Sequence, residues 1–222
     1  MKKAVIFDMY ETLITHFETP LYFGSEMAKD MGIDENVFLP AWRSTENDRT
    51  LGNLSTDDVV ERLLRDNNCY SSEVLKLVMD KRIATKVDCF NHLHNEIIPM
   101  LSTLKDKGIK IGLISNCFSE EAKVIRDSVL FPYFDAAMMS YEQNLRKPGE
   151  EIYYRCMETL GVSADECLYV GDGGSDELAT ASKVGMTPLQ ATWYLKEGTK
   201  QPVGRMKEYI GLTSPLEIIG YL

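Results

Sequence analysis

The segment Ala4-Val5-Ile6-Phe7-Asp8-Met9-Tyr10-Glu11-Thr12 decides the fold, because a continuous apolar run there ends abruptly at a carboxylate. Four consecutive apolar residues are typical of a parallel strand that is buried on both faces. Comparable runs occupy 109–114 and 168–170, and shorter ones 136–139 and 188–191. Amphipathic helical patterns alternate with these runs from residue 97 onward. The sequence therefore predicts an α/β fold with a parallel sheet that is covered by helices on both faces.

The stretch between residues 15 and 91 differs, because it contains helical patterns and no convincing strand. One helix is expected over 21–31 with Gly32 at its end, and another over 36–51 with Gly52 at its end. Ser55 and Asp58 resemble a capping box at the start of a third. We expect a core of residues 1–14 and 92–222, with a helical cap of residues 15–91 over the carboxyl ends of the strands, where ligands bind in such sheets.

Composition excludes several classes of function. Asp and Glu outnumber Lys and Arg by 34 to 24 in 222 residues, a net charge of −10 that disfavours nucleic acid as a partner. The apolar run at 4–7 is too short for a signal peptide or a membrane span. The five cysteines show no metal-ligand or disulfide spacing, which favours the cytoplasm. Oligomeric state stays open.

Four short polar motifs stand at the carboxyl end of a predicted strand or, in the case of Arg146-Lys147-Pro148, before a long helix. These motifs are Asp8-Met9-Tyr10-Glu11-Thr12, Ser115-Asn116, Arg146-Lys147-Pro148 and Gly171-Asp172-Gly173-Gly174-Ser175-Asp176-Glu177. A carboxylate at a strand end can attack phosphorus or carbon and form a covalent intermediate. A hydroxyl and a lysine can bind the oxygens of an anionic substrate. Ser119, which is followed by two acidic residues, is the expected cap of the next helix, which leaves the Ser115 hydroxyl for this binding role. Paired carboxylates around a glycine-rich turn suit Mg²⁺.

Taken together and in this order, the four motifs resemble those of the haloacid dehalogenase-like hydrolase superfamily, over essentially the whole chain. The resemblance implies a Rossmann-like parallel sheet core with an inserted α-helical cap, and Asp8 as the nucleophile. It implies that Lys147 offsets charge beside Asp8, that Ser115 and Thr12 bind the transferred group, and that Asn116 orients the substrate. It implies a Mg²⁺ ion held by Asp8, the Tyr10 backbone carbonyl, Asp172 and Asp176.

Tyr10 departs from the phosphatase pattern, which has a second Asp there as general acid and base. The 2-haloacid dehalogenases have Tyr at that place, and halide leaves without a proton donor, whereas an alkoxide benefits from one. Asp172, by contrast, resembles the metal-binding version of the last motif. Arg43 in the cap is a candidate substrate-binding residue by similarity to dehalogenases, although such an arginine is more often a surface residue. His16 is a hinge residue or a substrate contact, and Glu11 has no assigned role.

These residues favour a Mg²⁺-dependent phosphatase acting on a small anionic phosphorylated metabolite, with Asp8, Tyr10 and Lys147 at the reacting centre. The first alternative is a 2-haloacid dehalogenase, in which Asp8 attacks carbon. The second is a catalytically weak phosphometabolite-binding or regulatory protein. Tyr10 would suit such a protein, because binding survives the loss of the general acid.

Overall fold

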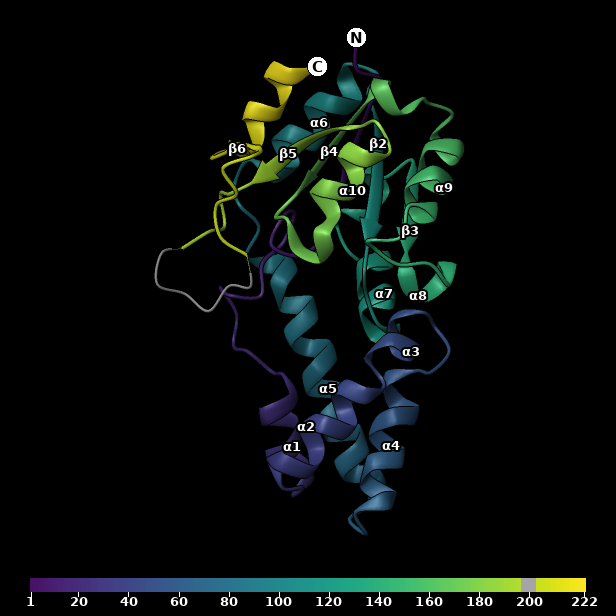
Figure 1. Cartoon of the computed structure of the whole chain (residues 1–222). Helices are drawn as coiled ribbons and strands as arrows, with labels where there is room; N and C mark the ends of the chain where they lie inside the picture. The colour runs from purple at the N-terminus through teal and green to yellow at the C-terminus, as the bar shows by residue number, and fades with distance from the viewer. Residues whose placement is uncertain (197–202) are drawn as a thin grey trace.

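A six-stranded parallel sheet forms the middle of the molecule in this computed structural model, which describes residues 1–196 and 203–222 (Figure 1). The spatial order is β3-β2-β1-β4-β5-β6, so β1 lies inside the sheet between β2 and β4. The strands are β1 Ala4–Phe7, β2 Lys110–Ser115, β3 Ala136–Met139, β4 Cys167–Gly171, β5 Thr187–Ala191 and β6 Ile210–Leu212.

Helices cover both faces of this sheet, as the apolar runs predict. Val5 and Phe7 face one layer, formed mainly by α6 (Ile97–Asp106) and α7 (Ser119–Arg126). Ala4 and Ile6 face the opposite layer, formed by α9 (Glu151–Leu160) and α10 (Glu177–Lys183). All four β1 side chains are fully buried, because successive residues of a strand point to opposite faces. The predicted α/β fold is confirmed.

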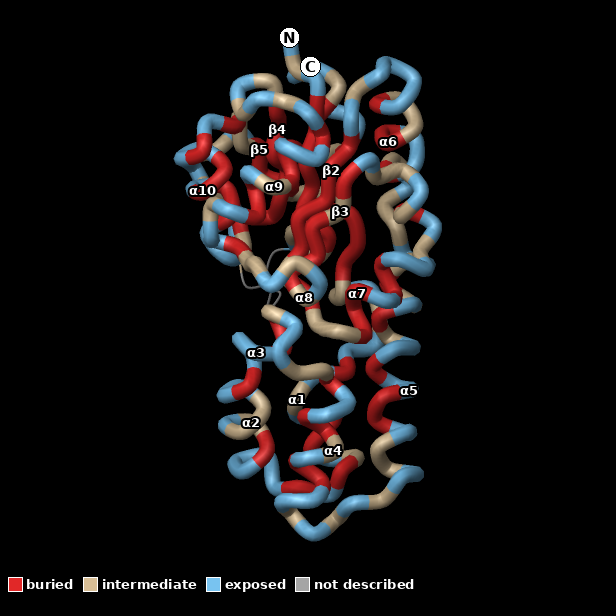
Figure 2. The backbone as a smooth tube through the Cα atoms, turned by 90° about the vertical axis from the view of Figure 1, so that its right-hand side faces the viewer, coloured by how far each residue is buried: buried red, intermediate tan, exposed pale blue. Residues whose placement is uncertain are grey.

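The helical block between β1 and α6 has a core of its own. Its helices are α1 Gly24–Met31, α2 Glu35–Ser44, α3 Glu46–Thr50, α4 Thr56–Asp66 and α5 Ser72–Asp88. Buried residues from Tyr22 to Met79 form a cluster separate from the two clusters of the sheet, visible as a second buried region in Figure 2. We call this helical block the cap; the division into a core of residues 1–14 and 92–222 and a cap of residues 15–91 stays a prediction, and Cys89 packs in the sheet cluster.

Two local features differ from expectation. Residues 36–51 form two helices instead of one, with Thr45 between α2 and α3. Ser119 does not cap α7: Phe118 is the cap residue, and its backbone N–H donates to the Glu121 carboxylate. The Ser119 hydroxyl instead accepts a hydrogen bond from the Thr56 backbone N–H in the cap, at 3.0 Å.

The capping box expected at Ser55 is present. Its hydroxyl accepts from the Asp58 backbone N–H at 3.1 Å, and α4 begins one residue later. The small helix α8 (Ser140–Gln143) completes the core. Within the described residues, none of the helices combines the length and the apolar character needed to cross a membrane.

Candidate active site

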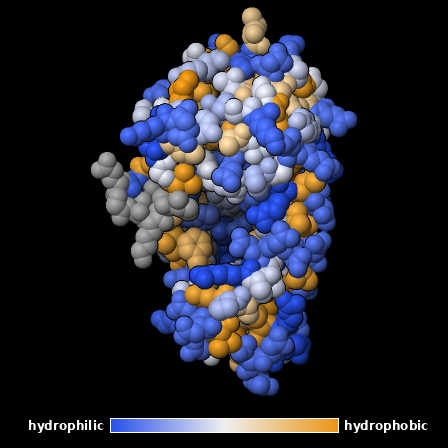
Figure 3. All heavy atoms as spheres, in the orientation of Figure 1, coloured by the Kyte–Doolittle hydropathy of each residue, from blue (hydrophilic) through white to orange (hydrophobic). Residues whose placement is uncertain are grey.

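A cavity of about 490 Å³ lies between the carboxyl ends of the strands and the start of the helical block. The space-filling view shows the molecule hollowed at this level (Figure 3). The cavity collects side chains that are far apart in sequence because parallel strands end at one edge of the sheet. Its lining is Asp8, Tyr10, Glu11, His16, Phe17, Leu21, Phe23, Asn116, Lys147, Asp172, Gly174, Ser175 and Glu177.

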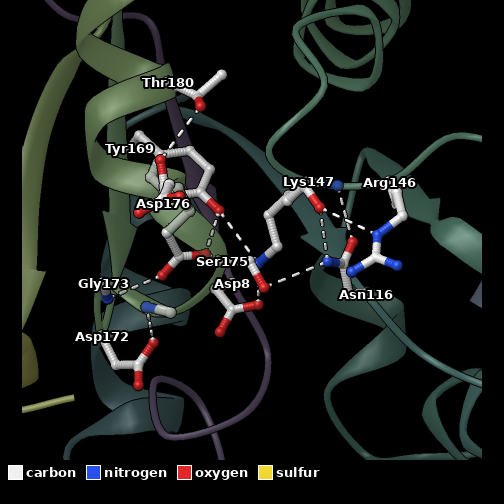
Figure 4. A network of polar contacts seen from close by, with 12 residues as sticks. Asp8, Asn116, Arg146, Lys147, Tyr169, Asp172, Gly173, Ser175, Asp176 and Thr180 are labelled. Atoms are coloured by element: carbon white, nitrogen blue, oxygen red, sulfur yellow. Dashed lines mark hydrogen bonds and ion pairs between the residues drawn. The ribbon is translucent and has the colours of Figure 1, made fainter. Parts of the chain in front are cut away.

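Lys147 links two buried carboxylates at the bottom of the cavity. Its Nζ lies 2.5 Å from Asp8 Oδ1 and 2.5 Å from Glu177 Oε2, and Figure 4 shows Lys147 and Asp8 pointing toward one another. Glu177 Oε2 also accepts from the Tyr169 hydroxyl at 2.8 Å, and Oε1 accepts from the Gly173 backbone N–H at 3.1 Å. Both oxygens of Glu177 are thus engaged, which fixes the ammonium beside Asp8.

The carboxylates carry more negative charge than Lys147 neutralises. Among the described residues, one group could hold a metal ion: oxygens of Asp8, Asp172 and Glu177 all lie within 4.8 Å of one another. Burial, followed by the Glu177 charge, raises the pKa of Asp8 to about 7. Burial, followed by the Asp8 charge, raises the pKa of Asp172 to about 6. A hard divalent cation bound there would relieve this repulsion, so the donor set fits Mg²⁺.

The structure brings Glu177, and not Asp176, into this group of carboxylates. Asp176 is exposed, and its backbone carbonyl accepts from the Thr180 hydroxyl. Ser175 and Asp176 both have positive φ, 54° and 52°, so the turn continues past Asp176 and α10 begins with Glu177. Sequence reasoning assigned Glu177 no role, although it stands in the same acidic motif.

Glu177 packs directly on Gly171, so a side chain at residue 171 would have to displace the Glu177 carboxylate. A Cβ at Gly171 would lie 2.0 Å from Glu177 Oε1. Gly173, with a φ of 105°, follows at the turn itself, where a residue without Cβ is favoured. The two glycines let the acidic turn fold back on the end of β4.

Asn116 holds the backbone of Lys147. Its side-chain oxygen accepts from the Lys147 N–H at 2.8 Å, and its amide nitrogen donates to the Lys147 carbonyl at 3.0 Å. The Ser115 and Thr12 hydroxyls are fully buried and have no hydrogen-bond partner in the described protein. Neither residue lines the cavity itself. A buried hydroxyl without a hydrogen-bond partner costs free energy. Ser115, at the end of a strand, and Thr12, in a loop, both carry this cost near Asp8.

Tyr10 lies in the cavity wall with its ring stacked on His16, at 4.5 Å between ring centroids. Its hydroxyl is buried and has no hydrogen-bond partner among residues 1–196 and 203–222, and burial raises the pKa of Tyr10 well above the ordinary value. Glu11 closes the loop after Tyr10: its carboxylate accepts from the Thr15 hydroxyl at 2.6 Å and from the His16 backbone N–H at 2.9 Å. These bonds give Glu11 a structural role in the loop, at a φ of 58°.

Arg43 is not brought to the site. It is exposed on α2 and lines none of the described cavities, whereas the adjacent Trp42 faces the core helix α7 through Phe118. Adjacent positions on a helix are about 100° apart, so one of the two must point away. The buried arginines of the cap are Arg49 and Arg82, which no motif singled out.

Comparison with known proteins places the chain in a family. The model of the haloacid dehalogenase-like hydrolases matches residues 2–185. The chain belongs to this family. It is therefore a hydrolase, as the four motifs implied.

Among curated relatives, a Clostridium perfringens protein whose name describes it as a pyrophosphatase is 33% identical over 119 residues, which span 48% of this chain and 56% of that protein. The glyceraldehyde 3-phosphate phosphatase of Methanocaldococcus jannaschii is 23% identical over 86% of this chain and 85% of its own. A solved structure of a 2-haloacid dehalogenase from Pseudomonas syringae has the same fold, with a TM-score of 0.67, 19% identity, and coverage of 99% and 97%.

Proposed function

We propose that this haloacid dehalogenase-like hydrolase is a Mg²⁺-dependent phosphatase acting on a small phosphorylated metabolite. The observation that carries the proposal is the group of three buried carboxylates, Asp8, Asp172 and Glu177, with Lys147 as the cation bonded to two of them. An anionic substrate cannot approach three carboxylates and one ammonium favourably unless a further cation is present.

Asp8 and Asp172 are the residues proposed to hold the ion, with the Tyr10 carbonyl beside them. Glu177 contributes less directly, because both of its oxygens are engaged by Lys147, Tyr169 and Gly173. When bound, Mg²⁺ would supply positive charge. This charge would favour the ionised form of Asp8 and attract a phosphoryl oxygen of the substrate. Asp176 is exposed on the turn. Its role as a ligand of the ion, or as a residue that holds metal-bound water, stays a prediction.

The chemistry proposed for the chain has two stages. An Asp8 oxygen forms a bond to phosphorus while the ester P–O bond breaks, and the leaving oxygen takes up a proton. Water then attacks the phosphorus of the aspartyl phosphate, releasing phosphate and restoring the carboxylate. Lys147 stays beside Asp8 throughout and offsets the charge on the transferred group. Binding of that group by the Ser115 and Thr12 hydroxyls, which are buried behind the cavity lining, stays a prediction.

Tyr10 makes both proton transfers slow. Its raised pKa, caused by burial and then by the Glu121 charge, makes the phenol a weak acid and a poor source of a general base at neutral pH. We therefore propose that the leaving group gains its proton, and the attacking water loses one, without an efficient side-chain catalyst. The expected turnover is low in comparison with an enzyme that has a carboxyl at this position.

Haloacid dehalogenation is the second candidate, and Tyr10 is the observation that favours it. In that reaction Asp8 attacks carbon and halide leaves unprotonated. Asp172 counts against it. Burial and then the Asp8 charge raise the pKa of Asp172, so keeping this carboxylate ionised costs free energy. A site without a cation would leave that cost unexplained. Relatives named as phosphatases also support the first candidate.

The test compares product release from two substrate classes. Phosphorylated metabolites and 2-chloropropionate are incubated with the protein, with Mg²⁺ or with EDTA. We expect Mg²⁺-dependent phosphate release that is lost in Asp8→Asn, and no halide release. Halide release without metal would establish the dehalogenase instead, and turnover that survives in Asp8→Asn would contradict both.

A further inference from the structure

A second chamber of about 480 Å³ adjoins the catalytic cavity, between the cap and the core helix α7. The two cavities share four residues in their walls: Tyr10, His16, Phe23 and Asn116. The remaining lining of the second chamber comes from Gly24, Trp42, Glu46, Arg82, Lys86, Phe118 and Glu121. A substrate with its phosphoryl group at Asp8 would therefore direct its leaving group along the shared wall into this chamber.

Lys86 is a buried ammonium held in a defined place in the second chamber. Its side chain is 5% exposed, and Nζ lies 2.7 Å from Glu121 Oε1 and 2.7 Å from His16 Nε2. Since an ammonium has no acceptor, it donates to His16 Nε2, and burial and then the Lys86 charge lower the pKa of His16, which keeps it neutral. The ammonium also lies 5.2 Å from the Tyr10 ring centroid and 5.7 Å from that of Phe23.

Two of the three Lys86 N–H groups are used by these partners, and the described residues provide no acceptor for the third. The ammonium is thus fixed by a carboxylate, a neutral imidazole and two aromatic faces. This arrangement is suited to binding an acceptor from a ligand, because little side-chain freedom remains to be lost when the ligand binds.

Among the described residues, the buried cations around this chamber are in ion pairs except at Arg49. The buried charges are three cations, Arg49, Arg82 and Lys86, and three carboxylates, Glu11, Glu120 and Glu121. Arg82 pairs with Glu120 and Lys86 with Glu121. Glu46 also lines the chamber but is exposed, so solvent screens its charge.

Arg49 has no carboxylate partner among the described residues, and its hydrogen bonds go to the Thr45 hydroxyl and the Trp42 carbonyl. Its guanidinium lies between the rings of Trp42 and Phe118, at 3.5 Å and 4.1 Å from their centroids, and both rings are chamber walls. Its Nη1 has no hydrogen-bond partner in the described protein. Burial, and then the Arg82 charge, lower the pKa of Arg49 to about 10. A negative ligand group in the chamber would offset this unfavourable charge.

We infer that the second chamber selects phosphate esters whose leaving group carries a carboxylate, with Lys86 as the residue that binds it. The inference rests on the proposed phosphatase function and names its substrate class: small phosphorylated acids. The substrate spans the two chambers, with the phosphoryl group at Asp8 and the carboxylate near Lys86.

Binding is tested without turnover, in Asp8→Asn with Mg²⁺, by isothermal titration calorimetry. The probes are matched pairs with one carbon skeleton: 3-phosphoglycerate against glycerol 3-phosphate, and 6-phosphogluconate against sorbitol 6-phosphate. The acid of at least one pair should bind about 10- to 100-fold more tightly than its alcohol, the range expected for one charge-assisted hydrogen bond. Equal affinities within both pairs would overturn the inference.

Lys86→Met, introduced into the same Asp8→Asn protein, should abolish the preference for the acid over its matched alcohol. Because this variant leaves Glu121 without its ion pair, Lys86→Met/Glu121→Gln is measured beside it, with circular dichroism to check folding. Lys81→Met is the matched control, since Lys81 lies on the same helix, is exposed and pairs with Asp30 outside the chamber. A preference that persists in the folded double variant would show that Lys86 does not bind the carboxylate.

The two proposals fail in different ways. Phosphate release from alcohols and acids at equal efficiency by the wild-type protein would remove the carboxylate selection and leave the phosphatase intact. Selective binding of acids without any phosphate release would remove the phosphatase and leave the chamber as a recognition site for phosphorylated acids.

Discussion

Replacing Gly171 by Ala tests the packing on which the acidic turn depends. The new methyl group would meet Glu177 Oε1 at 2.0 Å and Cδ at 2.6 Å, whereas ordinary van der Waals contact begins at 3.4 Å. Glu177 is fully buried and cannot move into solvent. Relieving the overlap must therefore displace the carboxylate from Lys147, Tyr169 or the Gly173 backbone N–H.

The magnitude follows from two contributions. Overpacking in a dense interior costs about 1–3 kcal/mol, and losing one charge-assisted hydrogen bond about 1.5–3 kcal/mol. Reduced freedom of the unfolded chain returns about 0.4–1 kcal/mol. We expect Gly171→Ala to lower the free energy of unfolding by about 2–5 kcal/mol, measured by urea denaturation with tryptophan fluorescence. Phosphatase activity should fall as well, because Lys147 loses one of its two anchors.

Two companion measurements identify the cause. Gly220→Ala, where an added Cβ meets nothing within 4 Å, should change stability by less than about 0.5 kcal/mol. In a Glu177→Ala background the obstacle is gone, so adding Gly171→Ala should cost less than about 1 kcal/mol, and the difference is the coupling of the two residues. The reasoning is refuted if Gly171→Ala is as stable as wild type, or if its cost is the same in both backgrounds.

Three further predictions concern the reaction. Lys147→Met should reduce kcat by about 100-fold or more, the cost of removing one preorganised charge partner, while Lys183→Met on the surface leaves kcat unchanged; equal effects would refute the role of Lys147. Tyr10→Asp should raise phosphatase kcat by at least about tenfold, toward the 10²–10⁴ of a positioned general acid, and unchanged activity would contradict our account of Tyr10. The folded-state pKa values of Asp8 and Asp172, about 7 and about 6, lie above the ordinary 3.8, so in metal-free protein both groups disfavour folding increasingly as pH rises from about 4 to about 7. The increase in Tm caused by Mg²⁺ should therefore grow across this range, and an increase that is independent of pH would argue against these carboxylates as ligands.

Sequence patterns predicted the sheet because each buried parallel strand needs a continuous apolar run and ends at a polar turn. The runs at 4–7 and 136–139 coincide with β1 and β3. Strand β6 was not predicted: it has three residues at the edge of the sheet, and its first, Ile210, is 49% exposed. Of its three residues only Leu212 is buried, whereas β3, at the opposite edge, has three buried residues and a continuous apolar run.

The site was predictable where a residue follows a strand directly, and less so inside a turn. Asp8, Asn116 and Asp172 directly follow β1, β2 and β4, and they line one cavity with Lys147, which lies between α8 and α9. The choice between Asp176 and Glu177 depends on two residues with positive φ, which sequence pattern does not reveal.

Contacts between cap and core were not predictable at all. Lys86 lies on α5 and its partner Glu121 on α7, and their pairing depends on how two helices from separate cores pack together. No local pattern encodes that geometry, so the sequence did not reveal which cations of the cap are buried. Arg43, the arginine singled out from the sequence, is exposed.

The central claim is that Asp8 attacks phosphorus, and the most direct test is mass spectrometry of the peptide containing Asp8. The protein is mixed with Mg²⁺ and a substrate identified by the screen, quenched in acid within the first turnover, and digested. A fraction of the peptide should carry the mass of one phosphoryl group at Asp8, because the poor general base Tyr10 slows hydrolysis of the aspartyl phosphate. Phosphate release with the phosphoryl group on another residue, or persisting in Asp8→Asn, would contradict the account.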